Sequence, residues 1–237
     1  MIMSEYFTRS EVLLGAPCMD ALRAKRVIIF GVGGVGSWAA ECLIRTGLTH
    51  LTLVDGDTVQ SSNINRQLPA TRETIGMPKV VALKARLLTI NPDAKIEALP
   101  IMVNGEWLQM NGLADYDYVI DAIDSVNDKT DLILYATRVR ELKIFSSMGA
   151  ALRYDPTQVT TGELMTIQGD ALAKAVRTRM KKLQLKPYKK VRCVYSTEQS
   201  QRCEARGSLM QVTAVFGCTL ASLVIDDIRK ATQKNAE

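Results

Sequence analysis

The chain has 237 residues, enough for one large domain or two small ones, and its hydrophobic content of 47% supports a substantial core. Its 30 lysines and arginines exceed its 25 aspartates and glutamates, and the resulting net charge of +5 is only a weak indication of a polyanionic partner. The N-terminus lacks a signal-peptide pattern and the chain lacks an 18-residue apolar run, so we expect a cytoplasmic protein without stable membrane insertion.

The segment from Tyr6 to Leu22 precedes the first predicted strand, and Ser10 can cap a short helix within it. It carries Arg9, and an exposed arginine in an N-terminal arm is usually just solvated. Taken alone, the pattern of this segment therefore assigns Arg9 no function.

Residues 26–55 have the order of a nucleotide-binding βαβ unit: an apolar strand Val27–Phe30, a glycine-rich turn, a helix Trp38–Leu48, and a second strand ending at Asp55. The turn contains Gly31, Gly33, Gly34 and Gly36. Such glycines let the backbone approach a phosphate, and the following helix N-terminus presents free N–H groups to it. Asp55, 19 residues beyond Gly36, stands about where a carboxylate bonds ribose hydroxyls. The turn alone does not distinguish a dinucleotide from a mononucleotide.

A cluster of acidic, amide and cationic residues follows the second strand. Its candidate nucleotide-binding members are Asp57, Asn63, Arg66, Gln67 and Lys79. A site that holds a triphosphate and releases pyrophosphate needs such cations and amides, whereas a hydride-transferring enzyme does not. Any one of these residues could lie in a solvated loop, but the ordered set favours ATP. Lys79 follows Pro78 in the first turn of a predicted helix and can serve phosphates as a point charge.

A strand predicted over Tyr116–Ile120 ends in two carboxylates, Asp121 and Asp124. Ligands bind at the carboxyl ends of strands in open α/β sheets, and paired carboxylates there suit Mg²⁺. Ser125 or Asp124 can also cap the helix that starts near Val126, and both roles are compatible.

The repeated strand–helix pattern predicts an α/β fold, with a doubly wound, mostly parallel Rossmann-like sheet. We expect one ATP-binding domain over 1–237, with a core over 24–150 and a substrate-facing C-terminal extension over 151–237. Short strands are predicted at Leu152–Thr161, Glu163–Ile167 and Val191–Glu198, and a long helix at Leu209–Lys230.

The stretch from Ala171 to Arg192, here called the basic stripe, contains nine cations and no acidic residue. The cations are Lys174, Arg177, Arg179, Lys181, Lys182, Lys186, Lys189, Lys190 and Arg192. Because nine exceeds the net charge of the whole chain, the rest of the protein is net acidic. A charge run is often a solvated face, but nucleic-acid phosphates are the commonest partner of such a stripe.

Five scattered cysteines without a Cys-x-x-Cys pair, and a single histidine, give poor support for a zinc site. Cys203 lies in a polar loop with Arg202 and Arg206 nearby, which favour the thiolate and make it a candidate nucleophile. The thiols in apolar segments, Cys42, Cys193 and Cys218, are expected in the core.

Three motifs together resemble the ATP-dependent adenylating enzymes of the ubiquitin-activating-enzyme superfamily, over roughly residues 5–228. They are the GxGGxG turn, D-x-D-x-V-x-x-S-N-x-x-R-Q beginning at Asp55, and G-x-x-K ending at Lys79. The resemblance implies that Arg9, in an aromatic-x-Arg arm, reaches ATP phosphates across a homodimer interface. It also implies that Asp124, the second aspartate of D-x-x-D, is the residue linked to Mg²⁺.

The segment V-x-C-V-Y-S-T-E at residues 191–198 and the missing zinc pairs resemble the superfamily's tRNA threonylcarbamoyladenosine dehydratases. That branch implies ATP-dependent cyclisation of a threonylcarbamoyl group in tRNA through an acyl adenylate. The implied catalytic set is Arg9, Arg66, Lys79, Asp124 and optionally Cys203.

Two other classes of function stay open. One is an adenylyltransferase for a small ubiquitin-like sulfur carrier, in which case a carrier or sulfur-transfer protein is the partner. The other is a nicotinamide oxidoreductase or a non-catalytic nucleotide-binding module, which lacks a convincing general acid because His50 precedes the second strand.

Overall fold

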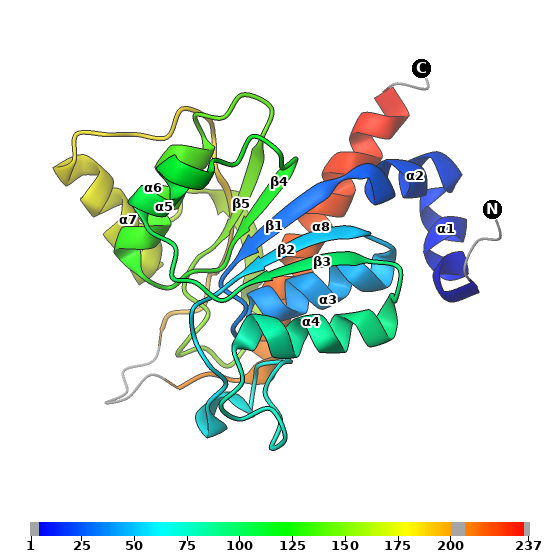
Figure 1. The fold of residues 1–237 in the computed structure, drawn as a ribbon. Helices are drawn as coiled ribbons and strands as arrows, with labels where there is room; N and C mark the ends of the chain where they lie inside the picture. Colours follow the sequence, from blue (N-terminus) through cyan, green and yellow to red (C-terminus); the bar gives the residue numbers. More distant parts are fainter. Residues whose placement is uncertain (1–4, 201–206, 235–237) are drawn as a thin grey trace.

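The structure, a computed structural model, describes residues 5–200 and 207–234 and is built on one seven-stranded sheet (Figure 1). The strand order is β3-β2-β1-β4-β5-β7-β6, and every neighbouring pair is parallel except β6 with β7. The strands are β1 Arg26–Phe30, β2 His50–Val54, β3 Lys95–Leu99, β4 Tyr118–Asp121, β5 Lys143–Ser147, β6 Val159–Glu163 and β7 Arg192–Ser196. The predicted doubly wound, mostly parallel sheet is confirmed.

Helices cover both faces of this sheet (Figure 1). On one face lie α2 Ala16–Ala24, α3 Gly36–Thr46, α4 Lys79–Ile90 and α8 Met210–Lys234, with α1 Thr8–Leu14 beside α2. On the other lie α5 Gly105–Asn111, α6 Val126–Ala136 and α7 Ala171–Lys182. Short 3₁₀ turns are η1 Glu5–Phe7, η2 Ser61–Asn63 and η3 Pro156–Gln158.

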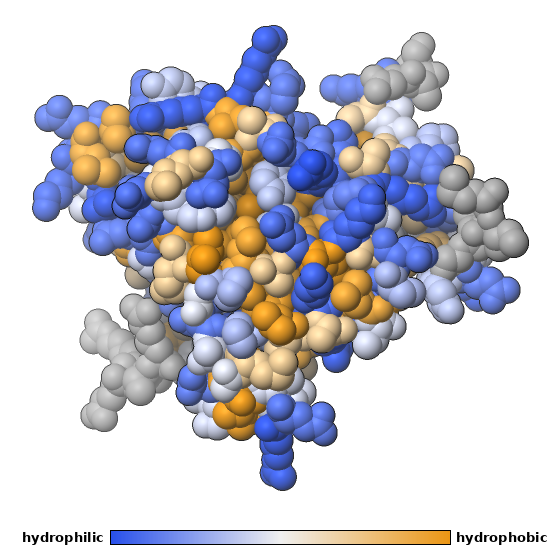
Figure 2. All heavy atoms as spheres, viewed as in Figure 1, coloured by the Kyte–Doolittle hydropathy of each residue, from blue (hydrophilic) through white to orange (hydrophobic). Residues whose placement is uncertain are grey.

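The sequence of β1 explains the two-sided core. Side chains alternate along a strand, so Val27 and Ile29 enter the hydrophobic cluster under α3 and α8, while Ile28 and Phe30 enter the cluster under α5 and α6. All four are fully buried, as expected of a central parallel strand that reads as a continuous apolar run. Figure 2 shows the surface in the same view, with hydrophilic side chains projecting around its rim and apolar atoms gathered toward its middle.

Two predicted strands of the C-terminal part differ from the structure. The strand expected over Leu152–Thr161 begins only at Val159, as β6, after the 3₁₀ turn Pro156–Gln158. The expected strand Glu163–Ile167 is absent, because Leu164–Thr166 form a turn after β6. The basic stripe begins with a helix, α7, which faces α6 through the buried residues Ala173, Val176 and Met180.

Helix α8 differs from the expectation that no segment of the chain is apolar enough to span a membrane. It is long and apolar enough to span a membrane by length and composition. However, Val212, Phe216, Leu220 and Val224 are fully buried in the core under the sheet. Packing against α3 and the sheet therefore accounts for the apolar composition of α8.

The strand order also places the site. β1 lies between β2 and β4, and the chain leaves β2 toward α4 on one face and β4 toward α6 on the other. This reversal creates a crevice at the carboxyl ends of the strands, which is where ligands bind in open α/β sheets. Gly31, Asp55 and Ala122 follow these three strands and meet at that edge.

Candidate nucleotide site

The turn between β1 and α3 is closed so tightly that two positions require glycine. Gly31 has φ +82°, and a Cβ there would lie 2.7 Å from the carbonyl oxygen of Ala122. A Cβ at Gly36 would lie 1.8 Å from the carbonyl oxygen of Gly31. The absence of side chains therefore brings the N-terminus of α3 to the crevice, where its free N–H groups can face an anion.

Asp55 ties the second strand to this turn. Its Oδ2 accepts a hydrogen bond from the Val32 backbone N–H at 2.8 Å, and its Oδ1 accepts one from the Asp57 N–H at 2.9 Å. Burial raises the pKa of the Asp55 carboxyl, and the nearby Lys79 ammonium opposes that rise. Each oxygen keeps a further lone pair, so Asp55 can accept from ribose hydroxyls while it holds the turn in place.

Lys79 begins α4 and points back toward the crevice. Its Nζ lies 2.6 Å from Asp57 Oδ2, and its side chain is 8% exposed while that of Asp57 is 57% exposed. The backbone N–H of Lys79 also donates to the Asp57 carbonyl at 3.0 Å. A buried ammonium with one half-exposed carboxylate partner is positioned to receive a second anion.

The segment around η2 places an amide and an arginine over the glycine-rich turn. The side chain of Gln67 is buried with its Nε2 3.5 Å from where a Cβ on Gly33 would be, and its Oε1 has no hydrogen-bond partner among the described residues. Arg66 packs its Cγ beside Gly34. Its Nη1 donates to Ser62 O and Asn65 Oδ1, at 2.9 and 2.8 Å.

Asn63, another residue predicted to bind nucleotide, is buried and stabilises the η2 turn. Its Oδ1 accepts the Gln60 backbone N–H at 3.0 Å and closes a capping box around η2. The structure therefore brings Asn63 near the crevice as a support for the turn that carries Arg66 and Gln67.

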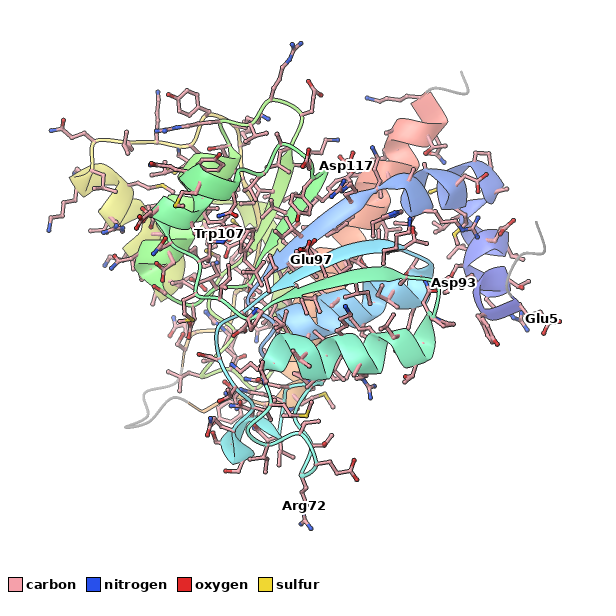
Figure 3. The ribbon with its side chains drawn as sticks, in the orientation of Figure 1. Glu5, Arg72, Asp93, Glu97, Trp107 and Asp117 are labelled. Carbon is pink, nitrogen blue, oxygen red and sulfur yellow. The ribbon has the colours of Figure 1, made fainter. Side chains whose placement is uncertain are left out.

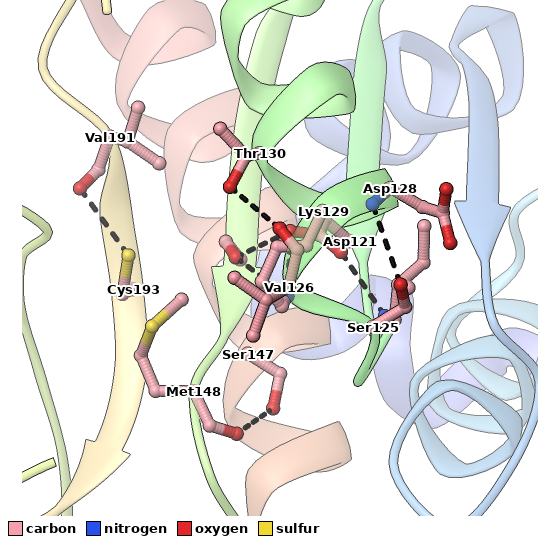
Figure 4. A network of polar contacts seen from close by, with 12 residues as sticks. Asp121, Ser125, Val126, Asp128, Lys129, Thr130, Ser147, Met148, Val191 and Cys193 are labelled. Carbon is pink, nitrogen blue, oxygen red and sulfur yellow. Dashed lines mark hydrogen bonds and ion pairs between the residues drawn. The ribbon is translucent and has the colours of Figure 1, made fainter. Parts of the chain in front are cut away.

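The two carboxylates at the end of β4 have different surroundings, and Figure 4 shows those of Asp121. Asp121 is fully buried, and its Oδ2 accepts from Lys129 Nζ at 2.7 Å and from Ser146 Oγ at 2.6 Å. Asp124 is exposed and makes no hydrogen bond or ion pair within residues 5–200 and 207–234. Ser125 caps α6 by accepting from the Asp128 N–H. Only Asp124 is therefore free to meet a ligand.

Sequence reasoning did not identify Lys129 as the partner of Asp121. Lys129 lies on α6, eight residues beyond Asp121, and a lysine at this spacing is usually taken for a solvated helix residue. The pair binds β4, α6 and β5 together, since Lys129 also donates to Ser146 Oγ at 3.2 Å. Removing one partner would leave a buried charge without its counter-ion.

Arg9 lies at the other end of the sheet. It is exposed on α1, and Phe7, just before that helix, contacts Gly47 at the C-terminus of α3. The 11 residues of α3 separate that end from the glycine-rich turn by about 15 Å. In Figure 3, Glu5 and Asp93 mark this far end, and Arg72 marks the loop near the crevice. The structure therefore does not bring Arg9 together with the other predicted site residues of the same chain.

Cys203 lies outside the described residues. Where the described chain resumes, Ser208 O accepts a hydrogen bond from Asn65 Nδ2 at 2.9 Å and Gly207 O accepts one from the Leu152 N–H at 2.9 Å. Thr213, in the first turns of α8, packs 3.3 Å from where a Cβ on Gly34 would lie.

The nine cations of the basic stripe divide into two groups. Four are engaged: Arg177 donates to Leu164 O, Arg179 pairs with Asp131, Arg192 donates to Thr161, and Lys189 donates to carbonyl oxygens of residues 139, 140 and 142. Five are exposed, and their side-chain amines make no hydrogen bond or ion pair to the described chain: Lys174, Lys181, Lys182, Lys186 and Lys190. Lys174 and Lys182 line a groove of about 500 Å³ between α6 and α7, and its lining also includes Val126 and Asn127 at the start of α6.

Residues 5–200 and 207–234 contain no group of three or more His, Cys, Asp or Glu side chains suited to a metal ion. A cation held by Asp124 would therefore need phosphate oxygens and water for its other ligands. This is the usual coordination of Mg²⁺ at nucleotide sites.

Comparison with known proteins agrees with this geometry. The ThiF family pattern matches residues 7–237. The tRNA threonylcarbamoyladenosine dehydratase of Bacillus subtilis is 39% identical over 196 residues, which cover 83% of this chain and 76% of the relative. The crystal structure of the E. coli tRNA N6-threonylcarbamoyladenosine dehydratase in complex with ATP has a TM-score of 0.91 at 32% identity and covers 99% of both chains. The E. coli molybdopterin-synthase adenylyltransferase is 36% identical over 113 residues, only 48% of this chain and 45% of the relative.

Proposed function

The chain belongs to the ThiF family, and from this premise we propose that it is an ATP-dependent dehydratase that cyclises threonylcarbamoyladenosine in tRNA. The observation that carries the proposal is the crevice itself. A glycine-rich turn, a carboxylate, a buried lysine and an arginine converge on it, and relatives with this fold along their whole length bear the dehydratase name.

The first step is adenylation of the substrate carboxylate. A carboxylate oxygen attacks the α-phosphorus of ATP, an acyl adenylate forms, and pyrophosphate leaves. Asp55 bonds the ribose, and the glycine-rich turn and the N-terminus of α3 hold the phosphates. Lys79 and Arg66 face the negative charge that develops on pyrophosphate, and such preorganised cations lower the barrier of phosphoryl chemistry.

Asp124 is the residue that would hold Mg²⁺, whose charge neutralises phosphate oxygens when it is bound. Asp57 is placed to retain Lys79 before ATP binds, since the two side chains are ion-paired. When a phosphate enters, the ammonium can share its three donors between Asp57 and the phosphate.

The second step needs few protein groups. The acyl adenylate is attacked intramolecularly by the substrate's own carbamoyl group, and AMP leaves. A tethered nucleophile reaches effective molarities of about 10⁵ M or more, so proximity supplies much of the rate. A covalent intermediate on Cys203 is optional in this scheme.

The tRNA is held by the free cations of the basic stripe. The five exposed lysines support this assignment because no carboxylate of the described chain neutralises them. The groove that contains Lys174 and Lys182 is also lined by Val126, which is two residues after Asp124 in the chain, so a phosphate backbone in it would lie near the helix that follows Asp124.

The working unit is a homodimer in the cytoplasm, with Arg9 serving the partner's ATP. The position of Arg9 far from its own crevice supports a role in trans. An exposed apolar surface on the same arm, with Val12 at 82% and Leu13 at 84% exposure, supports contact with a second subunit.

The alternative, adenylation of a small ubiquitin-like carrier, uses the same first step. The two are separated by measuring ATP–pyrophosphate exchange with bulk tRNA, with a sulfur-carrier protein, and with neither. We expect exchange and AMP release that depend on tRNA bearing the threonylcarbamoyl group. Exchange that depends only on the carrier protein would replace the dehydratase by the adenylyltransferase.

A further inference from the structure

Two cysteines that are far apart in the sequence meet between α3 and α8. Cys42 Sγ lies 3.3 Å from Cys218 Sγ, and the thiol of Cys42 donates a hydrogen bond to the sulfur of Cys218. Both residues are only partly buried, contrary to the expectation from sequence that they are ordinary core residues. This partial exposure is the basis for expecting that a small reagent reaches the pair.

The closeness of the two sulfurs follows from the helix crossing. Gly217 precedes Cys218, and a Cβ at that position would lie 2.4 Å from Val35 O and 2.9 Å from Ala39 N. The lack of a side chain thus brings α8 into direct contact with the backbone of α3. Since an S–S bond is about 2.05 Å long, the sulfurs need to approach by only about 1 Å more.

The chemistry of the pair differs from that of an isolated buried thiol. The hydrogen bond from Cys42 lowers the pKa of Cys218 to about 7, and the same contact raises the pKa of Cys42. Burial instead raises the pKa of the isolated thiols Cys18 and Cys193. The thiolate is the attacking form in thiol–disulfide exchange, so Cys218 is the nucleophile of this set.

We propose that Cys42 and Cys218 form a reversible redox site, at which a small-molecule disulfide such as oxidised glutathione closes a disulfide bond between α3 and α8. The Cys218 thiolate attacks one glutathione sulfur, and a glutathione thiolate leaves. Cys42 then loses its proton and attacks Cys218 Sγ, and the second glutathione thiolate leaves. The protein loses two electrons and two protons, and one oxidised glutathione becomes two reduced molecules. Reduced glutathione in excess reverses both steps.

The bond would join the two helices that carry the crevice. The N-terminus of α3 holds the glycine-rich turn, and Thr213, about one turn before Cys218 on α8, packs against Gly34 of that turn. The cross-link would also close a loop between residues 176 positions apart. A loop of that length strongly restricts the unfolded chain, so the oxidised protein should unfold at a higher temperature than the reduced protein.

The test uses the full-length protein, equilibrated with glutathione at increasing ratios of oxidised to reduced form. Free thiols are then alkylated in denaturant, and tryptic peptides are analysed by mass spectrometry. We expect peptide 27–45 linked to peptide 207–229, lighter by two hydrogens than the two reduced peptides together. The link should disappear on reduction and should be absent from Cys42→Ala and Cys218→Ala. A matched Cys18→Ala variant should retain it.

The proposal is overturned if oxidised glutathione alone yields no such link, or if either cysteine is joined instead to Cys203 or to a second molecule. An alkylation measurement gives an independent check in folded protein. Cys218 should react with iodoacetamide near pH 7 at least several-fold faster than Cys18, and Cys42→Ala should slow it. Equal rates for Cys218 in the variant and the parent, with both shown to be folded by circular dichroism, would contradict the assigned role of Cys42.

Discussion

Asp55 is the side chain whose replacement tests the nucleotide most directly. Asp55→Ala removes the acceptor for ribose hydroxyls and should weaken ATP binding by about 1.5–3 kcal/mol, the value of hydrogen bonds to a charged group. Isothermal titration calorimetry measures the change. Asp93→Ala, an exposed aspartate at the opposite end of the sheet, is the control and should bind ATP normally. Tight NADH binding without ATP binding would exclude the assignment.

The surroundings of Asp55 also predict how ATP binding varies with pH. Burial raises the pKa of this carboxyl in spite of Lys79, so the group becomes neutral at a higher pH than a solvated aspartate does. A neutral carboxyl is a poorer acceptor for ribose hydroxyls. ATP affinity should therefore fall as pH decreases through the raised pKa of Asp55.

Measuring ATP affinity against pH for the parent and for Asp55→Asn isolates this effect, because the protonation of ATP itself affects both proteins equally. The Asp55→Asn variant should bind ATP more weakly than the parent at neutral pH. It should not show the additional loss of ATP affinity that the parent shows at acidic pH. Identical pH profiles for the two proteins would rule out ionised Asp55 as a ribose acceptor.

Among the elements, the crossing of α3 and α8 depends on Gly217. Gly217→Ala would place a methyl group 2.4 Å from Val35 O and 2.7 Å from Trp38 Cβ, so the helices would have to separate. Overpacking of this kind typically costs about 1–3 kcal/mol. We expect a lower thermal midpoint for Gly217→Ala, whereas Gln211→Ala, an exposed change on the same helix, should leave it nearly unchanged. A thermal midpoint equal to the parent's would mean that α3 and α8 accommodate the added methyl group at their present separation.

The basic stripe is tested by changing cations that the fold does not use. Lys181→Ala/Lys182→Ala removes two exposed charges from the end of α7. Because log affinity falls with log salt at a slope of about 0.9 per duplex phosphate contact, the slope for tRNA should flatten by up to about 2. The apparent KM for tRNA should rise, and ATP affinity should stay the same.

Lys95→Ala/Lys234→Ala, a change of equal charge outside the stripe, is the control for the net charge of the protein. An equal loss of tRNA affinity in both variants would argue against a localised tRNA surface. Lys189 is unsuitable for this purpose, because its amine binds three backbone carbonyls and its loss would disturb the fold.

For the molecule as a whole, the position of Arg9 predicts an ATP site that is built from residues of two subunits. Arg9→Ala and Asp124→Ala homodimers should both be inactive, since each lacks one group at every site. A mixed dimer has one site that contains both native residues, so part of the tRNA-dependent ATP turnover should return. Verified heterodimers that stay inactive would mean that the arm serves no partner site.

The features that the sequence alone predicted are those set by interactions between residues that are close together in the chain. The βαβ unit, the glycine-rich turn and the place of Asp55 follow from local pattern, because apolar runs and glycine steric freedom act within a few residues. The doubly wound, mostly parallel sheet also followed, since parallel strands joined by helices have few allowed topologies.

Tertiary structure decided which charged residues are free. Local pattern did not distinguish Lys189, fixed by the carbonyls after α6, from exposed Lys190, or Asp121, buried with Lys129, from exposed Asp124. It also did not bring Cys42 to Cys218. The free energy of a charge or a thiol depends on burial and on partners supplied by distant segments, and those partners are known only once the helices have packed against the sheet.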